Sequence, residues 1–277
     1  MDAKIKKRQK LKIFGRPPKR RRTRGQVSIF IIVGIAIIAM VVLLFFYKSG
    51  MLPVIGSGKE VNPNAFLQSC VEGKVRESVD LILLQGGYAE NQLHLKFKFN
   101  NENYQNISYL CYTENYYVQC INQEPMLIKH LEDEIKNYIK EDIENCFESF
   151  VSELEKQDYS VDSFYNGFDV ELSSKQANLN IDGEVSYTKT EETLRHEEFA
   201  VSIPTRLYEL AIVSQEISSQ EAKFCNFDYH GFMLLYPEFD IEKFRTGDST
   251  TLYRIKDKKS NERMQFAVKS CVIPPGI

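Results

Sequence analysis

An uncharged stretch of 21 residues, from Val27 to Tyr47, constrains this chain more than any other feature of its sequence. As an α-helix rising about 1.5 Å per residue, it would cross the roughly 30 Å hydrocarbon layer of a bilayer. The apolar core of a cleaved secretory signal is only about 7–15 residues long, so the stretch is too long for that role. We therefore expect one N-terminal transmembrane helix over residues 26–47.

Charge is divided unequally on the two sides of this stretch. Residues 1–24 carry twelve basic side chains and one acidic side chain, whereas the rest of the 277-residue chain carries 23 basic and 37 acidic side chains. Because basic segments stay on the cytoplasmic side, we expect a cytoplasmic arm over residues 1–25 and an extracytoplasmic C-terminal part. We therefore expect a single-pass protein of the cell membrane. Its partners are the lipid bilayer and, through the arm, anionic lipid headgroups.

The basic run "PPKRRRTR", residues 17–24, also has the composition of a segment that binds nucleic acid. The arm contains one aromatic residue, Phe14, so stacking on bases has little support. Its charges directly precede the expected membrane helix. We therefore expect lipid contact and no nucleic acid.

The junction Arg24-Gly25-Gln26-Val27-Ser28 resembles the archaeal class III prepilin signal. In that family a basic residue and Gly precede the cleaved bond, and Gln and Ser follow at the first and third mature positions. The usual Glu at the fifth mature position, which neutralises a neighbouring subunit's N-terminus, is Phe30 here. The resemblance covers only residues 19–40. It implies, as an alternative, a pilin-like filament or surface-appendage subunit processed between Gly25 and Gln26.

Three short segments also look like a group of uncharacterised single-pass membrane proteins from small-genome archaea. They are "RGQVSIFIIVG", the helix ending "LQGGY" and the terminal "CVIPP". This resemblance implies an archaeal cell envelope and no particular activity.

All six cysteines follow the expected membrane helix: Cys70, Cys111, Cys120, Cys146, Cys225 and Cys271. An even number confined to the exported side is typical of disulfides in an oxidising compartment. Six buried thiols or metal ligands are the alternative. The chain contains no Cys-x-x-Cys, the spacing typical of zinc sites, so we expect no metal.

Six cysteines allow fifteen pairings, and we expect one of them. A short hairpin would place Cys111 beside Cys120. Cys70 and Cys146 each fall on the apolar stripe of an expected helix, and antiparallel packing would bring them together. The pair Cys225–Cys271 follows by elimination.

The exported part predicts an α+β fold, because helical and strand patterns alternate without a regular βαβ order. After a linker over residues 48–62, we expect a helix–strand–helix subdomain over 63–157 and a mostly β subdomain with one helix over 158–277. Asn62-Pro63 are typical of a helix start and Gly86-Gly87 of a helix end. Further helices are expected after Pro125 and from Thr205 to about Ala222.

Alternation of apolar and polar residues predicts the strands. They are expected over residues 92–99, over 109–120 as a hairpin, and at "FDVEL", "ANLNIDGEVSYTK", "FAVSI", "FMLLY", "TTLYRI" and "MQFAV". In the second of these quoted segments, Asp182-Gly183 is typical of a hairpin turn.

No catalytic or cofactor motif is found. The chain has four histidines and no His-Glu-x-x-His, Gly-x-Ser-x-Gly, Walker loop or dinucleotide fingerprint. We therefore expect no cofactor and no catalytic residue. A membrane-tethered hydrolase stays as a second alternative, since paired carboxylates leave no short motif.

Five tyrosines crowd the expected hairpin: Tyr104, Tyr109, Tyr112, Tyr116 and Tyr117. Tyrosines favour binding surfaces, but alternating strands would also place them in a core. Asn106-Ile107-Ser108 is a sequon, which predicts a glycosylated loop tip at Asn106. The sequence as a whole predicts an anchored extracytoplasmic binding or structural protein with a partner in the cell envelope.

Overall fold

A computed structural model describes residues 32–35, 37, 38, 40, 62–100 and 102–273. The chain divides into two compact units, Met1–Glu60 and Val61–Ile277. Its fold class is α+β, as the sequence predicts.

Seven residues of the first unit are described, and all are helical. The apolar side chains among them are exposed: Ile32, Val33, Ile35, Ile37, Ile38 and Met40. Over the ranges that the structure describes, no helix combines the length and the hydropathy needed to cross a bilayer. The expected arm, most of the expected membrane helix, the processing residues Gly25 and Gln26, and the linker up to residue 61 lie outside the described residues.

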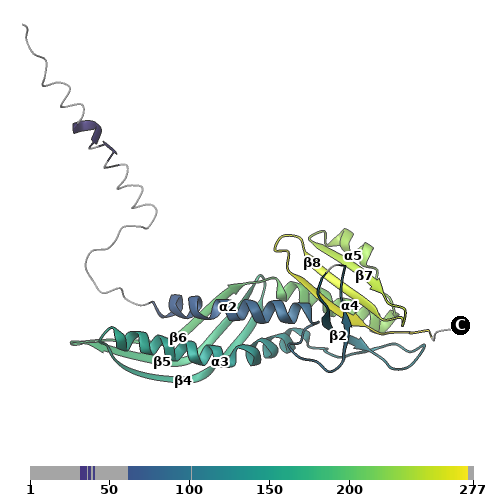
Figure 1. Cartoon of the computed structure of the whole chain (residues 1–277), viewed down its shortest axis with the longest axis horizontal. Helices are drawn as coiled ribbons and strands as arrows, with labels where there is room; N and C mark the ends of the chain where they lie inside the picture. Colours follow the sequence, from purple (N-terminus) through teal and green to yellow (C-terminus); the bar gives the residue numbers. More distant parts are fainter. Residues whose placement is uncertain (1–31, 36, 39, 41–61, 101, 274–277) are drawn as a thin grey trace, which may run out of the picture. The chain divides into compact units, whose positions relative to one another are not determined.

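The second unit contains four helices and nine strands among its described residues (Figure 1). In chain order they are α2 Pro63–Leu84, β1 His94–Phe97, β2 Gln105–Tyr112, β3 Ile121–Asn122, α3 Leu127–Lys156, β4 Ser160–Ser173, β5 Gln176–Lys189, β6 Glu192–Pro204, α4 Leu207–Phe224, α5 Tyr229–Leu235, β7 Phe239–Arg245, β8 Thr251–Asp257 and β9 Arg263–Val268.

The strands form two sheets. The long strands β4, β5 and β6 make a three-stranded antiparallel sheet, in that order. The other sheet has the order β1-β2-β9-β8-β7, with β3 paired to β2. Only the β2–β9 pairing is parallel among the strand pairs described.

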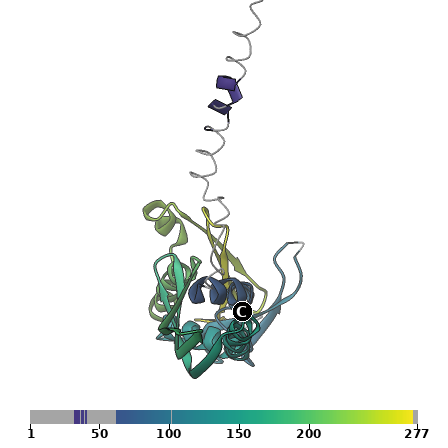
Figure 2. The ribbon, with the colours of Figure 1, turned by 90° about the vertical axis from the view of Figure 1, so that its left-hand side faces the viewer.

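Helices α2 and α3 lie side by side on the three-stranded sheet, and Figure 2 views them end-on. Asn62 begins α2 by accepting a 3.1 Å hydrogen bond from the N–H of Ala65, and Pro63 occupies the first turn, as expected. The two helices are antiparallel. Tyr138 of α3 donates to Glu77 of α2 at 3.1 Å, near the middle of both helices.

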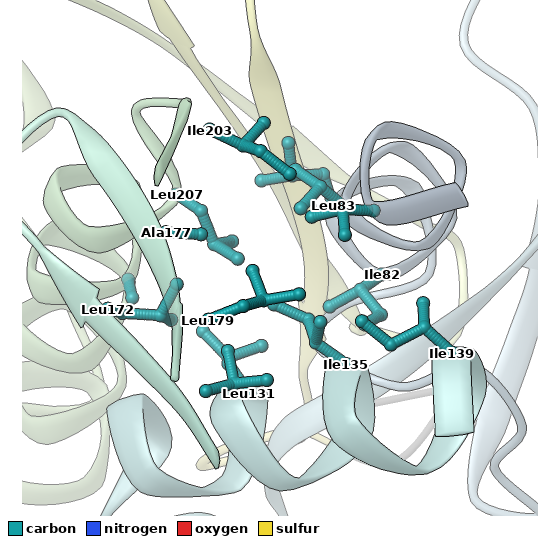
Figure 3. Packing of buried hydrophobic residues seen from close by; sticks show 14 of the residues in the cluster. Ile82, Leu83, Leu131, Ile135, Ile139, Leu172, Ala177, Leu179, Ile203 and Leu207 are labelled. Carbon is teal, nitrogen blue, oxygen red and sulfur yellow. The ribbon is translucent and has the colours of Figure 1, made fainter. Parts of the chain in front are cut away.

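The apolar stripes that the sequence predicts for these helices are buried against the sheet. Figure 3 shows their side chains meeting those of the three strands and of α4: Ile82, Leu83, Leu131, Ile135, Ile139, Leu172, Ala177, Leu179, Ile203 and Leu207. This core draws on both sides of the border expected at residues 157 and 158. Val61–Ile277 form one compact unit, and its core joins the two regions expected at 63–157 and 158–277.

Side chains of the two helices also reach the outer edges of the long sheet. Glu132 of α3 accepts a 2.9 Å hydrogen bond from the N–H of Leu172, on the free side of β4. Asn64 of α2 accepts one of 3.3 Å from the N–H of Ala200, on the free side of β6. Each bond satisfies a backbone donor that an edge strand otherwise presents to solvent.

The hairpin turn expected at Asp182-Gly183 is wrong, because β5 runs through both residues. The turns lie instead at Ser174-Lys175 and at Thr190-Glu191. Gly183 has another role. A Cβ atom there would lie 2.9 Å from the carbonyl oxygen of Phe164 and 3.2 Å from the ring of Phe147. The strand is irregular at this point, and only glycine allows such a close approach.

The strand expected at "FMLLY" is also wrong, because residues 229–235 form helix α5. Asp228 begins this helix by accepting a 3.0 Å hydrogen bond from the N–H of Gly231. Strand β7, which follows, is not among the expected strands.

Candidate binding groove

A groove of about 830 Å³ lies between α4 on one wall and α5 with the start of β7 on the other. Its apolar lining comes from both walls: Ile212, Val213, Phe232, Leu235, Tyr236 and Phe239. Polar and charged side chains complete it: Arg206, Glu209, Gln215, Glu216, Ser219, Gln220 and Glu238.

Helix α4 forms the first wall because one of its faces packs in the core while an adjacent face is turned to the groove. One face is buried in the core of the unit through residues such as Leu207, Leu210 and Ile217. The adjacent face lines the groove from Arg206 to Gln220. At about 1.5 Å per residue this face is roughly 21 Å long, so the groove follows almost the whole helix.

Helix α5 forms the second wall and has no buried residue, although most of its sequence is apolar. Phe232 and Met233 pack partly against the core and hold the helix in place. Leu234 and Leu235 are 85% and 77% exposed. Such a run of leucines in water is unfavourable, so a covering partner is the usual explanation of a surface of this kind.

Carboxylates stand on both walls. Glu216 lies on α4, and Glu238 lies between α5 and β7. At one end, Arg206 contacts Glu209 at 3.0 Å and Asp257 at 3.2 Å. Its charge is therefore already paired within the protein. The second carboxylate oxygen of Glu209 is buried and has no hydrogen-bond partner among the described residues.

Asp257 fixes this end of the groove. Its burial alone would raise the pKa of its carboxyl group. Hydrogen bonds from the N–H groups of Ser260 and Lys259, together with the Arg206 guanidinium, hold the pKa below its ordinary value instead. Asp257 is therefore ionised in neutral solution and keeps Arg206 at the first turn of α4.

A buried polar cluster holds the other end of α4 against the sheet. Glu221 is 3% exposed and accepts hydrogen bonds from Lys243 of β7, at 3.2 Å, and from the hydroxyl of Tyr253 of β8. A buried carboxylate with a cationic partner and a hydrogen bond is tolerated, whereas an unpaired one is costly. The cluster thus fixes the α4 wall relative to β7.

The sequence anticipates the α4 wall but not the α5 wall. The apolar spacing of α4 is long enough to identify a helix, whereas a run of five apolar residues is ambiguous between strand and helix. The available signal for α5 is Asp228, a residue type that favours helix starts.

The six cysteines form the three disulfides that the sequence predicts. The Cα atoms are 6.1 Å apart in Cys70–Cys146, 5.4 Å in Cys111–Cys120 and 5.8 Å in Cys225–Cys271. One detail differs. Cys70 is exposed, whereas the sequence places it on the buried stripe of α2.

The hairpin expected over residues 109–120 forms with later bounds: β2 pairs antiparallel with the short strand β3, and residues 113–120 are the loop between them. Hydrogen bonds tie it to the end of the chain, with Tyr117 donating to Val272 at 2.9 Å and Cys271 donating to Val118 at 2.8 Å. Of the five tyrosines, some pack in the core and others are exposed on the surface. Tyr109 is buried and Tyr112 half-buried, whereas Tyr104, Tyr116 and Tyr117 are exposed.

Asn106 lies within strand β2 and not at a loop tip. Its side chain is exposed, opposite Lys96 of β1, whereas Ser108 of the same sequon is buried. In the part of the chain that the structure describes, no three His, Cys, Asp or Glu side chains are placed to hold a metal ion.

Comparisons with known proteins give no match. No family model, no curated protein and no solved structure is similar to this chain.

Proposed function

We propose that this chain is a single-pass, membrane-anchored protein of the cell envelope that acts by binding a partner protein in its extracytoplasmic part. Binding takes place in the groove between α4 and α5. The N-terminal arm stays in the cytoplasm, next to anionic headgroups.

The anchor is supported by the charge step across Val27–Tyr47 and by the exposed apolar side chains of the helical residues 32–40 that are described. Exposed apolar side chains on helical residues favour a lipid environment. The three disulfides of residues 61–277 support an oxidising location.

The observation that carries the binding proposal is helix α5. It exposes Leu234 and Leu235 beside a groove of about 830 Å³ whose lining combines apolar side chains with polar and charged ones. Protein-binding surfaces usually combine apolar contacts with polar residues in this way.

The test is photo-crosslinking in cells of the native host, with a photoreactive amino acid in place of Leu235. A specific crosslinked protein is expected on the extracytoplasmic side. The matched control replaces Phe224, which is 62% exposed and does not line the groove. Equal crosslinking at both positions, or none at Leu235, would contradict binding in the groove.

The topology has a separate test, protease added to intact cells. It should digest the part after Tyr47 and spare the arm. Protection of the C-terminal part until lysis would show that the proposed orientation is wrong. Changing Arg20, Arg21, Arg22 and Arg24 to Glu should produce mixed orientations, because the basic bias falls.

A further inference from the structure

The walls of the groove offer side chains rather than backbone groups. Residues of α4 and α5 make their backbone hydrogen bonds within their own helices. At the start of the edge strand β7, the N–H of Phe239 donates to the carbonyl of Tyr236 and the N–H of Ile241 donates to the sulfur of Met233. A peptide that binds as an extended strand needs a row of free backbone groups on the protein. The occupant of this groove must therefore satisfy its own backbone, as an α-helix does.

The dimensions agree with a short helix. The α4 wall runs from Arg206 to Gln220. A partner helix of about 14 residues has the same length of roughly 21 Å. Its apolar face would contact Ile212 on one wall and Leu235 on the other.

The charges of the groove indicate which residues a partner helix would carry. Glu216 and Glu238 stand on opposite walls, and Arg206, the one cation among the described residues that line the groove, is already paired. Nearby, the ammonium group of Lys258 donates to the carbonyl of Pro237 at 2.7 Å. A helix lying between the two glutamates would present one flank to each, so basic residues on both flanks match the site.

The same charges disfavour two other occupants. Residues 61–277 carry 21 basic and 36 acidic side chains, a net charge of −15. A second copy of the chain or an anionic bilayer would bring like charges together at this groove, which opposes association.

We propose that the groove binds an amphipathic helix of a partner protein, with an apolar face flanked on both sides by Lys or Arg. The proposal rests on the proposed binding function and names its partner class.

The experiment uses the full chain in phosphatidylcholine nanodiscs and a dye-labelled synthetic helix of 14 residues. The probe has leucines along one face and lysines on both flanks; a matched probe has glutamates in place of the lysines. Fluorescence anisotropy, corrected with empty nanodiscs, measures the two dissociation constants. The lysine probe should bind about tenfold more tightly or better.

Two variants locate the binding. Leu234→Ser with Leu235→Ser removes exposed apolar contacts and should weaken the lysine probe by about tenfold. Glu216→Lys with Glu238→Lys should reverse the preference, so that the glutamate probe binds more tightly. Phe224→Ser and Glu155→Lys change exposed residues outside the groove and should leave both constants unchanged.

Equal binding of both probes, binding of neither, or a preference unchanged by the charge reversal would overturn the partner class. The crosslinking test at Leu235 does not depend on the probe. A specific crosslink together with failure of the lysine probe would therefore reject the basic helix and retain the binding function.

Discussion

Tyr88 and Tyr253 each direct a phenol hydroxyl at a carboxylate inside the protein. Tyr253 donates to Glu221, and Tyr88 donates to Glu124. Burial is the main cause that raises the pKa of both phenols, and the neighbouring carboxylate raises each further. Both tyrosines therefore remain protonated in the folded protein at a pH where free tyrosine ionises.

The raised pKa values predict a loss of stability in alkali. Above about pH 10 the unfolded chain loses the tyrosine protons while the folded chain retains them, so the unfolded state becomes more stable relative to the folded state. The contribution of these tyrosines to the free energy of unfolding is fully present below about pH 10. Above that pH, the contribution of Tyr253 falls by up to about 1.4 kcal/mol per pH unit. Urea unfolding from pH 9 to 11 measures this slope.

Tyr253→Phe tests the origin of the slope. The variant should be less stable than the parent at pH 8 and should show a smaller loss above pH 10. Tyr104→Phe, which changes an exposed side chain, is the control and should retain the parent slope. An unchanged slope in the Tyr253 variant would assign the alkaline loss to other groups.

Two glycines should respond in opposite directions to the same substitution. Gly183→Ala should lower the free energy of unfolding by about 1–3 kcal/mol, because its methyl group would clash with Phe164 and Phe147. Gly73 lies on the exposed face of α2, and a Cβ atom there would have no neighbouring atom within 4 Å. Gly73→Ala should therefore raise the free energy of unfolding by about 0.5–1 kcal/mol. Thermal unfolding measures both. A neutral Gly183→Ala would mean that β5 relaxes around the methyl group.

Among the elements, the disulfides should contribute unequally. Cys70–Cys146 joins α2 to α3 across 76 residues, whereas Cys111–Cys120 spans only 9. The loop-entropy relation gives about 4.5 kcal/mol for the first and about 2.6 kcal/mol for the second. The double variant Cys70→Ala/Cys146→Ala should therefore unfold at a lower temperature than Cys111→Ala/Cys120→Ala. The reverse order would show that local strain or packing outweighs the loop entropy.

The long helices are predictable from the sequence, whereas the short helix α5 and the continuity of β5 are not. Leu127 and Leu131 begin a periodic stripe that extends along all 30 residues of α3, so the helix is unambiguous. The seven residues of α5 are too few to show a period. Asp182-Gly183 has the composition of a turn, but the glycine serves the close approach of Phe164, a tertiary contact that no local pattern records. The groove was missed for the same reason, since one of its walls is α5.

At the scale of the whole molecule, the anchor proposal predicts the mass of the mature protein. Phe30 replaces the carboxylate that prepilins use in filament assembly, so we expect the basic arm to remain attached. Intact-mass measurement on protein from the native host should give a chain that retains residues 1–25. A mature chain beginning at Gln26 would instead support the pilin-like alternative.

The hydrogen bonds that Glu132 and Asn64 accept from the outer strands of the long sheet have a consequence for crowding. Under the proposed anchor, copies tethered to one membrane would meet in two dimensions, at local concentrations far above those in solution. Edge strands with unpaired backbone groups would let neighbouring copies pair through their sheets and aggregate. With helix side chains occupying the backbone donors at Leu172 and Ala200, neighbouring copies have fewer free groups to pair with at these edges. Under the proposed anchor, this would help a dense population of these molecules to stay individually mobile in the plane of the membrane.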